Sequence, residues 1–93
     1  MQVYAVFGLR EPALVRANIK KSYDQSHYEA GNGVFFIASS SETTQQVASK
    51  LGFGDASGVQ QTSGIVVSVA NYWGRHNPDL WEWIRIKQAE NGG

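Results

Sequence analysis

The tripeptide Gly31-Asn32-Gly33 constrains the fold of this chain more than any other short feature. Glycine and asparagine tolerate positive φ angles, which the tight turns between antiparallel strands require. Residues 27–30 before it predict a short strand, and the continuous apolar run of residues 34–38 after it predicts a central strand. We therefore expect a β-hairpin over residues 27–38.

The N-terminal side of this hairpin predicts a strand followed by a helix. Residues 2–9 are largely β-branched and aromatic, which suits a buried strand. Pro12 favours the first turn of a helix, where the missing N–H has no partner to lose. Val15, Ile19 and Tyr23 then recur at intervals of four and form one apolar stripe. The pattern predicts a helix from Pro12 to about Tyr23.

The C-terminal side repeats the alternation of strand and helix. Ser39 stands three residues before Glu42, which predicts a capping box at the start of a helix over residues 43–51, with Gly52 as its stop. Residues 54–63 are polar and without period, and we expect them to form the most mobile loop. Residues 64–73 predict the longest strand. Asn77-Pro78-Asp79 then predicts the start of a last helix.

The predicted elements follow one another as β-α-β-β-α-β with an additional C-terminal helix. Two βαβ-type halves joined by a hairpin are typical of the ferredoxin-like α+β fold. We expect one domain over residues 1–93, with a four-stranded antiparallel sheet and the first two helices on the same face. In this order the strand that begins at Gly64 lies at the edge of the sheet.

Composition narrows the classes of protein to which the chain can belong. Of its 93 residues 42% are hydrophobic and 17% charged, which is typical of a globular domain. There are no cysteines, so a disulfide framework and a thiolate metal site are excluded. Eight basic and eight acidic residues give a net charge of zero, whereas nucleic-acid binders usually carry excess positive charge. The apolar run of residues 3–9 is too short to span a membrane and lacks the features of a signal peptide, so we expect a cytoplasmic protein without membrane association.

The sequence contains no recognisable catalytic or metal-binding motif. His27 and His76 each lack a second ligand at metal-binding spacing, and helix capping accounts for the serines of residues 39–41. The glycine pairs at positions 31 and 33 and at positions 52 and 54 lack the full spacing of a phosphate-binding loop. We therefore expect no metal, no cofactor and no enzymatic activity.

Residues 72–86 concentrate the aromatic side chains of the chain, including all three tryptophans. Successive residues of an α-helix are rotated by about 100°, so Trp81, Trp83, Ile84 and Ile86 cannot all face one side. One interpretation is that the last helix lies across the open end of the sheet with one tryptophan half exposed. The other is a binding or dimer surface, since tryptophan, tyrosine and arginine dominate interface energetics. The candidate binding residues are Tyr72, Trp73, Arg75, His76, Trp81 and Trp83.

Three functions are compatible with these observations. The favoured hypothesis is a non-enzymatic, homodimeric interaction module that binds another protein. The first alternative is a nucleic-acid or nucleotide binder that combines the aromatic segment with four basic residues, Arg10, Arg16, Lys20 and Lys21. The second alternative is a small enzyme that uses Arg75 and His76 at the end of a strand.

The predicted edge strand, residues 64–73, contains neither a charged residue nor a proline. Natural proteins use such residues to prevent edge pairing, or they cover the edge. Either the C-terminal helix covers it, or a second copy of the chain does so with Trp73 and Trp81 near the two-fold axis. We expect the second arrangement.

Three segments carry a resemblance to a known family: VYAVFGL, GVFFIASSSETTQQVASKLG and GIVVSVANYW. In layout the chain resembles the SinR-like proteins and the small CRISPR-adaptation subunit related to them. The resemblance implies a ferredoxin-like fold and dimerisation through the sheet. In the adaptation subunit an acidic residue associated with metal-dependent nuclease activity follows the first strand. Here Gly8-Leu9-Arg10 occupies that place and Glu11 is displaced toward the helix, which argues against nuclease chemistry.

Overall fold

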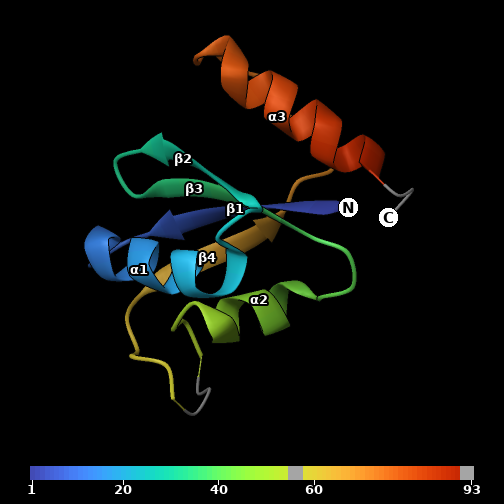
Figure 1. The fold of residues 1–93 in the computed structure, drawn as a ribbon. Coiled ribbons are helices and arrows are strands. Elements are labelled where there is room, and N and C mark those ends of the chain that lie inside the picture. Colours follow the sequence, from blue (N-terminus) through green and yellow to red (C-terminus); the bar gives the residue numbers. More distant parts are fainter. Residues whose placement is uncertain (55–57, 91–93) are drawn as a thin grey trace.

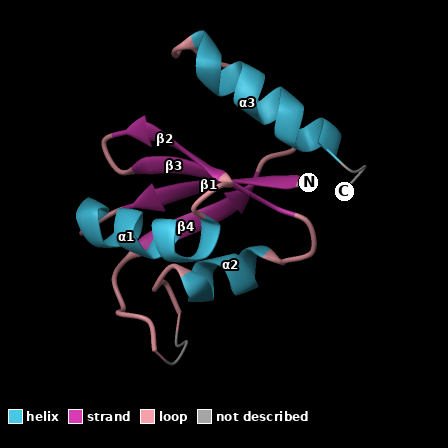
Figure 2. Ribbon diagram, in the orientation of Figure 1, coloured by secondary structure: helices cyan, strands magenta, loops and turns pink. Residues whose placement is uncertain are grey.

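The computed structural model describes residues 1–54 and 58–90 and shows an α+β domain with helices on both faces of a sheet (Figures 1 and 2). The sheet is antiparallel throughout and has the strand order β2-β3-β1-β4. In chain order the elements are β1 (Gln2–Gly8), α1 (Pro12–Tyr23), β2 (His27–Gly31), β3 (Val34–Ser39), α2 (Thr44–Lys50), β4 (Gly64–Ser68) and α3 (Pro78–Ala89).

The hairpin predicted around Asn32 is confirmed. Gly31, Asn32 and Gly33 have φ angles of 109°, 54° and 80°, all in the left-handed region. Gly33 also lies against the end of β1, since the Gly8 N–H donates to its carbonyl oxygen over 2.7 Å. A side chain at position 33 would come within 2.8 Å of the Gly8 carbonyl oxygen. Glycine is therefore required there both for its backbone angle and for the close approach of β1.

Helices α1 and α2 cover one face of the sheet, as expected (Figure 1). We call this the α1–α2 face. Its core combines alternate residues of the two central strands with the apolar stripes of both helices, because alternate strand residues point to the same face. The buried residues of this core are Tyr4, Val6, Val15, Ile19, Tyr23, Phe35, Ile37, Val47 and Leu51.

Helix α3 covers part of the opposite face, which we call the α3 face (Figure 2). Its buried residues Leu80 and Ile84 pack with Val3 of β1, while Tyr28 and Phe36 contribute from β2 and β3. The helix packs mainly against β1 and β2. It therefore lies over the sheet face rather than across an open end. Ile86 is 43% exposed, in agreement with the expectation that the apolar residues of this helix cannot all be buried together.

The strand predicted over residues 64–73 is shorter in the structure and ends at Ser68. Ser68 lies opposite Tyr4, and each later residue lies opposite an earlier residue of β1. The Val69 N–H still donates to the Val3 carbonyl oxygen over 2.9 Å. Position 70 is then opposite Gln2, the first residue of β1. Val69 and Tyr72 pack against the core of the α3 face, so the chain leaves the sheet here and crosses that face.

The capping box predicted at Ser39 and Glu42 is wrong. Helix α2 is capped by Thr43, whose hydroxyl accepts from the Gln46 N–H while the Gln46 side chain accepts from the Thr43 N–H. Ser39 is the last residue of β3 and is paired with Gln2, which places it before the helix. The predicted stop is confirmed, because Gly52 has a φ of 93° and follows the last turn.

The predicted mobile loop of residues 54–63 falls partly outside the described residues, which omit 55–57. Its described C-terminal part is tied to the domain by hydrogen bonds. The Thr62 N–H donates to the Gly52 carbonyl oxygen over 2.8 Å, and the Leu9 N–H donates to the Ser63 carbonyl oxygen over 3.0 Å. The Thr62 hydroxyl donates to the Glu11 carboxylate over 2.8 Å. These bonds align the chain for entry into β4.

Helices α1 and α3 each contain 12 residues. In the part of the chain that the structure describes, no helix has the length and apolar character needed to cross a membrane.

Ile19 tests whether α1 is part of the core. Its side chain is 0% exposed, and Ile19→Ala removes buried methyl groups and leaves a cavity. We expect the free energy of unfolding to fall by about 2–5 kcal/mol. Urea unfolding measures this value, and Lys20→Ala on the exposed side of the same helix is the control. A loss well below about 1 kcal/mol would remove Ile19 from the core.

Candidate functional site

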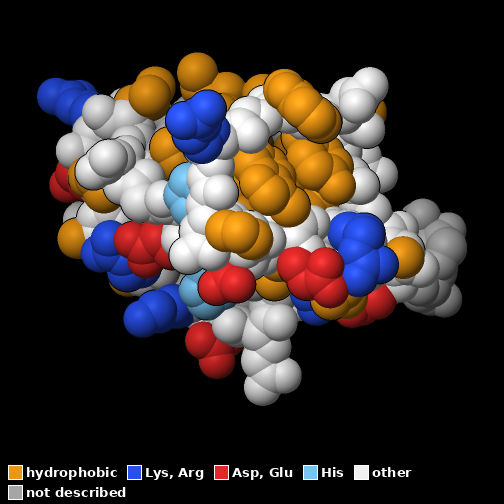
Figure 3. Space-filling view, turned by 90° about the horizontal axis from the view of Figure 1, so that it is seen from above, with side chains coloured by type: hydrophobic (Ala, Val, Ile, Leu, Met, Phe, Trp, Pro, Cys, Tyr) orange, Lys and Arg blue, Asp and Glu red, His pale blue; other side chains and the backbone are white. Residues whose placement is uncertain are grey.

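An aromatic surface forms where the chain leaves β4 and enters α3. The entry into α3 is set by Asn77, whose side chain accepts from the Asp79 N–H over 3.1 Å, and by Pro78 in the first turn. This start fixes the helical position of Trp81. Figure 3 looks onto the α3 face and shows hydrophobic side chains gathered there with basic side chains beside them.

Tyr72, Trp73 and Trp81 form the concave part of this surface. The rings of Tyr72 and Trp81 are stacked, with centroids 5.8 Å apart and planes inclined by 10°. Together with Trp73 and Gly74 they line a pocket of about 270 Å³. The Trp73 side chain is 100% exposed, so it contributes nothing to the core. Burial of a large aromatic side chain is strongly favourable, and its complete exposure leaves that free energy available for binding. We call these four residues the aromatic pocket.

Two other candidate binding residues lie away from the aromatic pocket. Trp83 is half-buried and packs against Tyr28 of β2, with ring centroids 6.1 Å apart. His76 meets the same tyrosine edge-on at 6.4 Å, and its Nε2 lies 3.0 Å from the Ala30 carbonyl oxygen. Trp83 and His76 therefore hold α3 and its N-terminal loop onto β2. The sequence grouped them with the pocket because it shows proximity along the chain but not in space.

Arg75 is exposed and has neither a hydrogen bond nor an ion pair within residues 1–54 and 58–90. It follows Gly74 directly, so a free guanidinium lies next to the aromatic pocket in the chain. Arginine is common at interfaces because its planar side chain both stacks and donates hydrogen bonds.

The basic residues of the nucleic-acid alternative do not join this surface. Arg16, Lys20 and Lys21 lie on α1, whereas the aromatic pocket lies on the α3 face. Arg16 is also occupied, because its Nε and one terminal nitrogen donate to the two carboxylate oxygens of Glu29 over 2.8 and 2.5 Å. Arg10 lies exposed in the turn between β1 and α1. The sheet thus separates the aromatic pocket from the basic residues of α1.

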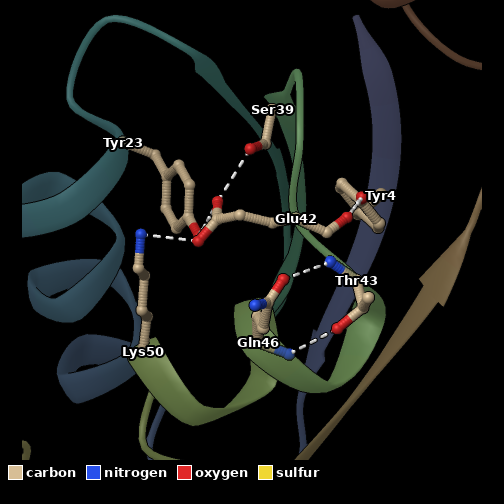
Figure 4. Close-up of polar contacts among 7 residues, drawn as sticks. All are labelled: Tyr4, Tyr23, Ser39, Glu42, Thr43, Gln46 and Lys50. Carbon is tan, nitrogen blue, oxygen red and sulfur yellow. Dashed lines mark hydrogen bonds and ion pairs between the residues drawn. The ribbon is translucent and has the colours of Figure 1, made fainter.

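Polar side chains gather around Glu42 on the α1–α2 face, and Figure 4 shows this cluster. The Glu42 carboxylate accepts from the Tyr23 hydroxyl over 2.8 Å and from the Ser39 hydroxyl over 2.7 Å, and it lies 2.5 Å from the Lys50 ammonium group. The Glu42 carbonyl oxygen accepts from the Tyr4 hydroxyl. The spacing of Ser39 and Glu42 in the sequence signals this cluster, because the Ser39 hydroxyl bonds the Glu42 carboxylate, whereas Thr43 caps the helix.

The electrostatics of the cluster favour an ionised Glu42 and neutral tyrosines. Burial alone would raise the pKa of Glu42, but hydrogen bonds from Lys50, Ser39 and Tyr23 outweigh it and hold the pKa below its ordinary value. Burial and the bond to Glu42 raise the pKa of Tyr23 well above its usual range. Tyr23 is therefore a hydrogen-bond donor rather than a base, and the cluster joins α1, α2 and β3.

The described part of the chain contains no cluster of side chains that could bind a metal ion. Within residues 1–54 and 58–90, no three histidine, aspartate or glutamate side chains gather closely enough to hold a metal ion. His27 contacts a backbone carbonyl, with its Nδ1 2.9 Å from the Tyr23 oxygen.

Comparison of the chain with protein-family models, curated proteins and solved structures finds no significant match. Function must therefore be argued from the geometry of the domain itself.

The Glu42 cluster predicts a pH dependence of stability. Because the pKa of Glu42 is lower in the folded chain than its ordinary value of 4.5, its stabilisation is complete above that value and is lost as the pH falls through the folded pKa. We expect Glu42→Gln to lower the free energy of unfolding by about 1–3 kcal/mol at pH 7. The difference from wild type should shrink below pH 4.5.

Denaturant unfolding over a range of pH measures this difference. The control is Glu82→Gln, which removes an exposed pair with Arg85 and should change stability little. A Glu42→Gln protein that matches wild type at pH 7 would contradict a stabilising role for the cluster.

Proposed function

We propose that the protein is a non-enzymatic interaction module that acts as a homodimer and binds another protein through its aromatic pocket. The observation that carries the proposal is the complete exposure of Trp73 beside the stacked rings of Tyr72 and Trp81. Few residues dominate a typical protein interface, and tryptophan, tyrosine and arginine are enriched among them. Trp73, with Tyr72 and Arg75 beside it, brings these three residue types together.

We further propose that the domain is ferredoxin-like. The support is the strand order β2-β3-β1-β4 with every neighbouring pair antiparallel. In this order β3 lies between β1 and β2, and β1 lies between β3 and β4. Each βαβ half is thus split by a strand of the other half, which is the pattern of this fold. The same layout is what the likeness to SinR-like proteins rests on, and we keep that relationship as a hypothesis.

The homodimer is supported by apolar exposure at β4. The apolar side chains of Ile65 and Val67 are 50% and 42% exposed. The strand that carries them contains no charged residue. These side chains point to the α3 face, because Val66 between them packs into the core of the α1–α2 face. A second copy is one way to cover them.

A nucleotide or single-stranded nucleic acid is the second candidate ligand, because Arg75 directly follows Gly74 of the aromatic pocket in the chain. Bases stack on aromatic rings, and a nearby cation binds the phosphate. The zero net charge and the location of Lys20 and Lys21 on the other face of the sheet disfavour this ligand. An enzyme that uses His76 has less support, since its Nε2 contacts the Ala30 carbonyl group.

Replacement of Trp73 tests the protein-binding function. Partners are captured from the source cells with immobilised wild-type protein, and the affinity of each purified partner is then measured by titration calorimetry. We expect Trp73→Ala to weaken the Kd by about 30-fold, the equivalent of about 2 kcal/mol for an interface hot spot. Leu9→Ala is the matched control, because Leu9 is 61% exposed but lies in the turn after β1. Equal affinities for wild type and Trp73→Ala would contradict the proposal.

Salt dependence separates the two candidate ligands. Under our proposal a fluorescently labelled oligothymidine should show no salt-sensitive binding to the protein at micromolar concentrations. If nucleic acid is the ligand, log K should fall linearly with log salt, with a slope of about −0.7 for each phosphate contacted on a single strand. A slope of this kind that is reduced in Arg75→Ala would favour nucleic acid over a protein partner.

A further inference from the structure

Strand β4 is hydrogen-bonded to β1 on one side only, because it is the last strand of the sheet. Two bonds define which peptide groups face β1: Val69 N–H donates to the Val3 carbonyl oxygen, and Leu9 N–H donates to the Ser63 carbonyl oxygen. In an antiparallel pair the hydrogen-bonded positions alternate with non-bonded ones. Every second residue from 63 to 69 therefore directs its peptide groups at β1.

The intervening residues Gly64, Val66 and Ser68 consequently direct their N–H and C=O groups away from β1, toward the free edge. Exposed edges of this kind are templates for pairing with another chain. Charged side chains or proline would prevent such pairing, and β4 contains neither. The edge is thus competent to add a further strand.

In the described part of the chain, helix α2 contacts β4 from the α1–α2 face, where Val47 is buried in the core, and no further strand pairs with the edge. Helix α3, the covering element considered from the sequence, packs mainly against β1 and β2. Phe53 lies against Gly64, but its ring occupies the place where a side chain at position 64 would project. Residues 64 and 66 of a strand point to the same face of the sheet. Val66 packs against the core of the α1–α2 face, so a side chain at position 64 would point to that face too. The Phe53 ring therefore packs on the α1–α2 face of β4 and leaves the edge of the strand open.

We propose that β4 pairs with β4 of a second copy, antiparallel about a two-fold axis at Val66, so that one eight-stranded sheet runs through the dimer. This inference rests on the homodimer of the proposed function and specifies its interface. In this register Val66 pairs with Val66 of the second copy, and Gly64 pairs with Ser68. It is the register in which all three outward-facing residues of each strand find a partner. A shift in either direction leaves one of them unpaired.

The same register joins the exposed apolar side chains of β4. It places Ile65 opposite Val67 of the second copy, on the α3 face of both chains. This is a non-hydrogen-bonded pair with respect to the new interface, the type in which opposing side chains approach most closely. Apolar β-branched pairs across strands stabilise a sheet. The pairing brings no like charges together, because β4 has none.

Introduced cysteines test the register directly, because the natural chain contains no cysteine. Ile65→Cys and Val67→Cys are prepared as separate proteins and oxidised alone and as an equimolar mixture. In the proposed register the Cβ atoms of position 65 and of position 67 in the second copy lie about 4.5–5.5 Å apart, which suits a disulfide. Identical positions are diagonal neighbours about 7–8 Å apart, beyond the reach of an unstrained disulfide. Leu9→Cys is the control for non-specific oxidation.

We expect a covalent dimer from the mixture and little from either variant alone. Crosslinking of Ile65→Cys alone or of Val67→Cys alone would overturn the register, because it places the two-fold axis at that residue. Crosslinking of Leu9→Cys to the same extent as the mixture would show random collision and overturn the interface. Circular dichroism of each variant checks that it retains the wild-type fold.

Sedimentation equilibrium separates failure of this interface from failure of the homodimer. We expect a dimeric wild type, a dimer weakened at least about tenfold by Val67→Lys, and no change in the Leu9→Lys control. A dimer that Val67→Lys leaves intact, with no crosslink in the cysteine mixture, would overturn the β4 interface but retain the homodimer. A wild type that stays monomeric at tens of micromolar would overturn both.

Discussion

Strand β1 is the element on which the rest of the structure depends, because it is hydrogen-bonded on both sides and buried on both faces. Its even-numbered residues Tyr4 and Val6 enter the core under α1 and α2, whereas Val3 packs with α3. Two independent hydrophobic layers thus meet on one seven-residue strand. A one-residue slip of its register would exchange the two sets of side chains and disrupt both layers at once.

The two faces of the sheet are closed by different means. On the α1–α2 face the apolar core is joined to the Glu42 cluster. The Glu42 carboxylate contacts side chains from α1, β3 and α2, and its carbonyl oxygen accepts from the Tyr4 hydroxyl of β1. On the α3 face the covering layer is a helix together with an irregular segment rich in aromatic residues. This layer extends over β1 and β2 but leaves Ile65 and Val67 of β4 exposed. The binding surfaces that we propose lie on this incompletely covered side.

The aromatic pocket follows from the early end of β4. After β4 the chain leaves the sheet and crosses the α3 face, where Val69 and Tyr72 pack against the core formed with α3. The crossing segment places the Tyr72 ring against the Trp81 ring of α3, and the Trp73 side chain is fully exposed to solvent. The pocket is therefore formed by a connection that packs against the core of the α3 face while leaving the Trp73 side chain exposed.

Local chemistry in the sequence determined much of the fold. The positive φ angles at residues 31–33, the stripe from Val15 to Tyr23 and the start of α3 at Asn77 each depend on neighbours within about one turn, and each was predicted correctly. Interactions between distant residues decided the rest. The end of β4 at Ser68 goes with the packing of Val69 and Tyr72 on the α3 face, and the role of Glu42 depended on Tyr23 and Lys50 rather than on capping. The division of residues 72–83 into a pocket and a contact with Tyr28 was likewise decided by tertiary structure. A sequence displays the groups that can form such contacts, but only the folded chain brings together partners that are tens of residues apart.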